Sequence, residues 1–86
     1  MSADALTERD RAILALEAAW PRHGGMKEEV IRARLGMSAA RYYQLLGRLI
    51  DSEAALEFDP MLVRRLRRLR DSRGARRAAR IPGFTG

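Results

Sequence analysis

The sequence predicts an all-α domain of four helices with a basic, flexible C-terminal tail. Alanine, leucine and arginine dominate the 86 residues and β-branched residues are scarce, a composition that favours helix over strand. Apolar residues also recur at helical spacing, and start and stop signals bound each segment. We expect helices at about residues 8–20, 26–35, 39–51 and 60–73. Residues 1–73 then form one domain, and residues 74–86 form the tail.

The first two helices have recognisable ends. Thr7 can cap the first helix, because its hydroxyl can accept from the backbone N–H of Asp10, whose carboxylate can reach back to Thr7. Pro21 disfavours helix at the residue before it and therefore ends this segment. The second helix ends at Gly36, in the position where left-handed backbone favours glycine.

The second and third helices together match the helix-turn-helix pattern. Gly36 supplies the left-handed turn, Met37 is an apolar residue that can fill the angle between the helices, and Ser38 can cap the next helix. Four apolar positions fall where such a pair packs together, namely Ile31, Leu35, Tyr42 and Leu46. The pattern predicts a helix-turn-helix at residues 27–50, and the alternative is a plain helical hairpin without a role on DNA.

The fourth helix follows a connection, residues 52–58, that has room for one helical turn. Asp59 is a good cap, and Pro60 occupies the first helical position, which proline favours. Gly74 is the expected stop. One apolar stripe lines this helix, at Leu62, Leu66 and Leu69.

Positive charge is concentrated at the C-terminal end of the chain. Residues 1–59 carry eight basic and ten acidic side chains, a net charge of −2, whereas residues 60–80 carry nine arginines and one acid. Such a one-sided cluster is typical of a surface that binds nucleic acid, and the planar guanidinium can donate two hydrogen bonds to one phosphate. The alternatives are a solvated helix face with a disordered tail, or contact with an acidic protein or a membrane surface.

If the third helix enters a major groove, its early exposed residues read bases. We expect Arg41 and Gln44 to do so, since arginine pairs with guanine and glutamine with adenine through two-point contacts. The remaining candidates contact phosphate or a partner without reading sequence. They are Tyr43, Arg48, Arg64, Arg65, Arg67, Arg68, Arg70, Arg73, Arg76, Arg77 and Arg80.

Catalysis is not expected from this sequence. Cysteine is absent, which excludes disulfides, thiolate chemistry and cysteine ligation of zinc. His23, the single histidine, lies in a proline and glycine loop with no second ligand nearby. No nucleophile, base and orienting group share a segment, and no glycine-rich phosphate loop exists. We therefore expect no enzyme activity, no catalytic residue, no metal and no cofactor.

Membrane insertion is not expected either. No apolar run approaches the ~20 residues that a membrane-spanning helix needs. The N-terminal residues MSADALTERD also lack a charged-then-apolar signal pattern. We expect a cytoplasmic protein, associated with the nucleoid if it binds DNA.

Three blocks of this sequence resemble a known family: LTERDRAILALEAAW, GMKEEVIRARLGMSAARYYQLLGRLID and DPMLVRRLRRLR. The chain resembles small actinobacterial helix-turn-helix proteins catalogued as a domain of unknown function, over residues 6–73. The most specific parts are RYYQ (41–44), LID (49–51) and DPMLVRRLRRLR (59–70). The resemblance implies a protein of the transcription apparatus and brings no catalytic site.

Taken with the resemblance, the residues lead us to expect a small DNA-binding protein of the transcription machinery or nucleoid. In this interpretation helix 39–51 docks in the major groove of double-stranded DNA and arginines of residues 64–80 lie on phosphates. The alternative is a protein-interaction module that docks on a sigma factor or RNA polymerase without reading DNA sequence. RNA binding is a third possibility, but no RNA-specific feature supports it.

Overall fold

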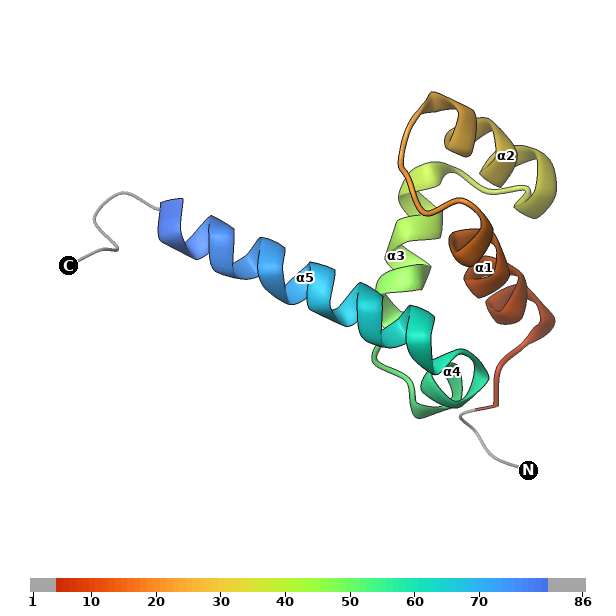
Figure 1. Ribbon diagram of the computed structural model, residues 1–86. Helices are drawn as coiled ribbons and strands as arrows, with labels where there is room; N and C mark the ends of the chain where they lie inside the picture. The colour runs from red at the N-terminus through yellow and green to blue at the C-terminus, as the bar shows by residue number, and fades with distance from the viewer. Residues whose placement is uncertain (1–4, 81–86) are drawn as a thin grey trace.

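The computed structural model describes residues 5–80, and every regular element in that range is a helix, as predicted. Figure 1 shows α1, α2 and α3 as a packed body, with the short α4 at its base and α5 extending away from it. The elements are α1 (Glu8–Ala19), α2 (Gly25–Leu35), α3 (Ala39–Leu49), α4 (Glu53–Phe58) and α5 (Pro60–Arg80).

The predicted starts of the first and third helices and the predicted end of the second are confirmed, whereas α1 ends one residue earlier, α2 begins one residue earlier and α3 ends two residues earlier than predicted. The Thr7 hydroxyl accepts from the Asp10 backbone N–H at 3.0 Å, and the Thr7 N–H donates to the Asp10 carboxylate at 3.0 Å. Gly36 has φ 64° and ψ 30°, the left-handed conformation that a glycine adopts without strain. Ser38 then caps α3 by accepting from the backbone N–H of Arg41 at 3.2 Å.

The prediction of four helices is wrong by one within residues 5–80, because α4 forms in the connection before α5. Ser52 caps this helix by accepting from the backbone N–H of Ala55 at 3.2 Å, and the Ala55 side chain is fully buried. Six residues are too few to display a helical period, so no pattern in the sequence distinguishes α4 from a loop.

The last helix begins as predicted but is longer than predicted. Asp59 accepts from the backbone N–H of Leu62 at 3.2 Å, and Pro60 is the first residue of α5. The helix passes Gly74 and continues to Arg80, so the first part of the predicted tail is helical. A glycine costs a helix only about 1 kcal/mol relative to alanine, and the flanking arginines and alanines favour helix strongly. The rest of the predicted tail, residues 81–86, lies outside the described residues.

The core forms where α1, α2 and α3 pack pairwise and where the start of α5 packs on α4. Fully buried side chains come from the three helices of the body, from α4, which contributes Ala55, and from α5, which contributes Val63. The predicted inward residues Ile31, Tyr42 and Leu46 are buried, and Met37 is half-buried beside them. The core therefore buries one face of α3 and leaves its other faces exposed.

Candidate nucleic-acid interface

One exposed face of α3 carries the residues predicted to read bases. Arg41 and Gln44 are both exposed, and the Arg41 guanidinium donates to the Gln44 side-chain oxygen at 3.1 Å. Arg48, one helical turn further on, is exposed on the same side. The three side chains form a polar surface, here called the Arg41 face, which consists of Arg41, Gln44 and Arg48.

The turn before α3 sets how this face is presented. The left-handed Gly36 reverses the chain after α2, and the half-buried Met37 packs against the core. Tyr42, Leu45 and Leu49 are buried on the side of α3 that faces the body. Because these anchors are rigidly packed, the Arg41 face is held on a fixed element and not on a loop.

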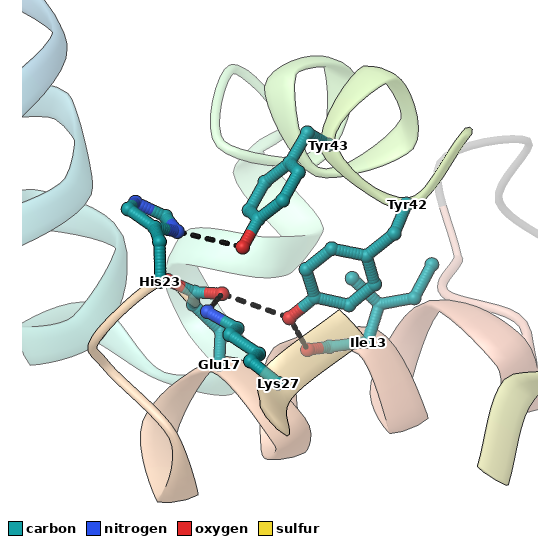
Figure 2. Close-up of polar contacts among 6 residues, drawn as sticks. All are labelled: Ile13, Glu17, His23, Lys27, Tyr42 and Tyr43. Atoms are coloured by element: carbon teal, nitrogen blue, oxygen red, sulfur yellow. Dashed lines mark hydrogen bonds and ion pairs between the residues drawn. The ribbon is translucent and has the colours of Figure 1, made fainter. Parts of the chain in front are cut away.

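A buried polar network connects α1, α2 and α3 on the core side of α3 (Figure 2). The Lys27 ammonium lies 2.6 Å from a Glu17 carboxylate oxygen, and each residue is only 2% exposed. The Tyr42 hydroxyl lies 2.8 Å from the same Glu17 oxygen, to which it donates, and 3.3 Å from the Ile13 carbonyl oxygen. Burial raises the pKa of the Tyr42 hydroxyl, and the hydrogen bond to Glu17 raises this pKa further.

The charged and polar groups of this network are satisfied within the protein. Lys27 and Glu17 satisfy each other's charge, and no buried side-chain polar atom in residues 5–73 lacks a hydrogen-bond partner. A buried ion pair adds little net stability over apolar residues, but it is strongly destabilising to break. Since Glu17, Lys27 and Tyr42 come from three different helices, the network sets the positions of those helices relative to one another.

Tyr43 lies away from the Arg41 face, so the structure does not bring it together with the predicted base readers. Its hydroxyl shares a hydrogen bond of 2.6 Å with Nδ1 of His23 (Figure 2). Its ring packs edge-on against Tyr42, and the Lys27 ammonium lies 5.4 Å from its centroid. The half-buried Tyr43 and the exposed His23 therefore attach the α1–α2 loop to α3.

The arginines of α5 divide into two groups. Arg67 donates from Nε to the carbonyl oxygen of Ile50, and Arg70 pairs with Asp51 at 2.7 Å. The hydrogen bond to Asp51 raises the pKa of Arg70. These two predicted phosphate contacts thus bind the C-terminal end of α3 in this structure.

The arginines of the other group are exposed and are not paired with a described acidic side chain. Among the described side chains, none forms an ion pair with Arg64, Arg65, Arg68 or Arg73. Arg76, Arg77 and Arg80 continue α5, but their side chains lie outside the described part of the chain. The exposed group can therefore contact phosphate without first breaking an internal ion pair.

Neither Glu17 nor Lys27 stands out in the sequence as a functional group. A signal is nevertheless present, because Glu17 follows Ile13 by four residues and Lys27 precedes Ile31 by four. Each charge thus occupies an inward position of its helix, and the two charges have opposite signs. His23 has no such signal, since it lies in a loop without periodicity.

Gly47 lies within α3 on the open side of the helix, and a Cβ atom there meets nothing within 4 Å. We expect Gly47→Ala to raise the free energy of unfolding by about 0.5–1 kcal/mol, because alanine loses less backbone entropy in a helix. Urea denaturation followed by circular dichroism measures the change. Gly36→Ala is the control, and we expect it to be destabilising because φ there is +64°. A loss of stability in Gly47→Ala contradicts the prediction.

The fold and this surface define a small all-helical domain with a basic helix that extends from its body. The chain belongs to the family described as protein of unknown function, DUF3263, whose model matches residues 5–78. The predicted membership in a family of unknown function is thereby confirmed. No curated protein and no solved structure matches the chain. Within residues 5–80, none of the helices combines the length and apolar character that crossing a membrane requires.

Proposed function

We propose that this protein binds double-stranded DNA as a small factor of the transcription machinery or nucleoid. In this proposal α2, residues 36–38 and α3 act as a helix-turn-helix, with α3 in the major groove. The single observation that carries the proposal is the Arg41 face, exposed on the second of two helices that a left-handed glycine joins. Arg41 and Gln44 are near the start of α3, where recognition helices contact bases.

The composition of the Arg41 face fits base reading by two side chains. Arginine makes two hydrogen bonds to guanine, and glutamine makes two to adenine, each pair giving about 1–3 kcal/mol of discrimination. Ala40 is exposed and small, so it permits close approach of α3 to the groove. Two readers specify a short site, and the remaining affinity comes from phosphate contacts.

Phosphate contacts are assigned to the exposed arginines. Arg48 lies on the Arg41 face, and Arg64, Arg65, Arg68 and Arg73 are free on α5. Arginine is always charged in proteins and releases counterions when it neutralises a phosphate. The alternative function, docking on RNA polymerase or a sigma factor, needs an apolar anchor beside these arginines, and Leu69, which is 46% exposed on α5, favours it.

The proposed function is tested by selecting a preferred duplex from a random pool and measuring binding by fluorescence anisotropy. We expect Arg41→Ala and Gln44→Ala each to weaken binding to that duplex by about 1–3 kcal/mol, with little change on random duplex. Arg9→Ala, which removes an exposed arginine of α1, is the control and should change neither. Equal losses on both duplexes show that α3 does not read bases, and no binding at low salt rejects DNA binding altogether.

A further inference from the structure

A groove with a volume of ≈ 710 Å³ lies between α3, α5 and the α1–α2 loop. In Figure 1, α5 begins beside the C-terminal end of α3 and then extends away from the body. The groove uses a different side of α3 from the Arg41 face, since its α3 residues are Tyr43, Leu46 and Gly47, followed by Ile50 directly after the helix. The DNA proposal gives the apolar lining of this groove no role and uses only Arg65 and Arg73 at its rim.

The α5 wall of the groove is an apolar stripe that continues out of the core. Leu62 is 3% exposed, Leu66 is half-buried and Leu69 is 46% exposed, and these leucines are spaced four and three residues apart on one helix face. Leu66 and Leu69 line the groove opposite Leu46 and Ile50 of α3. The stripe therefore extends past the described side chains that pack on it.

At Gly47 no side chain projects from α3 into the groove. A Cβ atom at this position meets nothing within 4 Å, so no described neighbour requires a glycine there. Glycine nevertheless costs the helix about 1 kcal/mol relative to alanine. Its effect on the groove is to leave space beside Tyr43 and Leu46 for an incoming side chain or backbone.

The rim of the groove is positively charged. Arg65 and Arg73 line it, and no described acidic side chain pairs with either one. Arg70 also lines it and shares its charge with Asp51 and Asp71. Glu17 is the carboxylate within the lining, and it is buried and neutralised by Lys27. An occupant with acidic side chains is therefore favoured over a neutral or basic one.

We infer that this groove binds an acidic amphipathic helix of a protein partner. Two diverging helices with apolar inner faces accept a third helix through anchors spaced i, i+3 or i+4, and i+7. Such anchors bury Leu66 and Leu69, while aspartate or glutamate beside them pairs with Arg65 and Arg73. The inference does not rest on DNA binding, because Gly47, Leu66 and Leu69 have no role on DNA and the Arg41 face stays free when the groove is filled. Arg65 and Arg73 are shared, so an acidic partner competes for them with DNA phosphate.

The test pans the full-length protein against a display library of helical peptides of about 15 residues, or about four turns. Enriched peptides are then synthesised and titrated by fluorescence anisotropy against the parent and three variants. Gly47→Leu fills the groove, and Leu69→Glu places an acid in its apolar wall. Arg41→Ala is the matched control on the other face of α3. Thermal denaturation of Gly47→Leu at or above the parent temperature shows that the fold is intact.

We expect the enriched peptides to share an apolar i, i+3 or i+4, i+7 pattern flanked by acids. Gly47→Leu and Leu69→Glu should each lower the affinity for these peptides by about tenfold or more, while Arg41→Ala leaves this affinity unchanged. Absence of enrichment, or binding that survives both groove variants, overturns the inference. Self-association of the protein that Gly47→Leu abolishes also overturns the inference, because it assigns the groove to a second copy of this chain. Loss of duplex binding in Gly47→Leu without peptide enrichment assigns the groove to DNA and also overturns it.

Discussion

Replacing Lys27 by methionine should lower the free energy of unfolding by about 3–5 kcal/mol, because it leaves the Glu17 carboxylate buried without its cation. The Tyr42 hydroxyl still donates to that carboxylate, but one neutral donor does not compensate a buried charge. Domains of this kind have total stabilities of about 5–15 kcal/mol, so the variant should be close to unfolding at room temperature. Urea denaturation followed by circular dichroism measures the loss.

Two further variants separate the ion pair from other effects of the substitution. The double variant Glu17→Met/Lys27→Met replaces both charges by apolar groups and should be more stable than Lys27→Met alone. Glu28→Gln, which alters the exposed neighbour on α2, should change stability by about 0.5 kcal/mol or less. If Lys27→Met is as stable as the parent, the pair does not link α1 to α2 in solution.

The proposed DNA binding should weaken steeply as salt is added. We expect a log–log slope of about −4 to −7 for a random duplex, so affinity falls roughly 10²–10⁴-fold between about 50 and 200 mM salt. The physical reason is release of counterions from each phosphate that an exposed arginine neutralises. Fluorescence anisotropy with a labelled duplex of random sequence, titrated at several salt concentrations, measures the slope.

A full-length variant with Arg73, Arg76, Arg77 and Arg80 changed to glutamine supplies the comparison. Glutamine keeps the helix propensity of α5 high and removes the charge. The arginines that bind the end of α3, Arg67 and Arg70, are untouched, so the body stays intact. The slope should become less steep by about 0.9 for each of these arginines that contacts phosphate. A parent slope near zero rejects phosphate contacts as the source of affinity.

Most helix ends were predictable because short-range signals set them. The Thr7 and Ser38 caps, the left-handed Gly36 and the Pro60 start each depend on residues within one turn. The end of α5 was not predictable in this way, because Gly74 is a weak stop within a strongly helical sequence. Helix α4 was missed because it is short and its buried Ala55 carries no period.

The candidate site was predictable only in part. Arg41 and Gln44 are exposed side by side, as their spacing on α3 implies. Arg67 and Arg70 resemble their neighbours in the sequence, yet they bind the end of α3. Nothing in a run of arginines distinguishes a free guanidinium from one that contacts another helix, because the contacting residues are 17 and 19 positions away.

The helical composition, most helix boundaries, the apolar faces and the concentration of arginine near the C-terminal end are properties of the local sequence. These properties follow from local propensity, capping and spacing, which act between residues close along the chain. In contrast, the packing of the helices brings Lys27 to Glu17 and Tyr43 to His23, and it makes α3 and α5 enclose a groove. Each of these depends on how separate helices pack, and packing brings together residues that no local pattern relates.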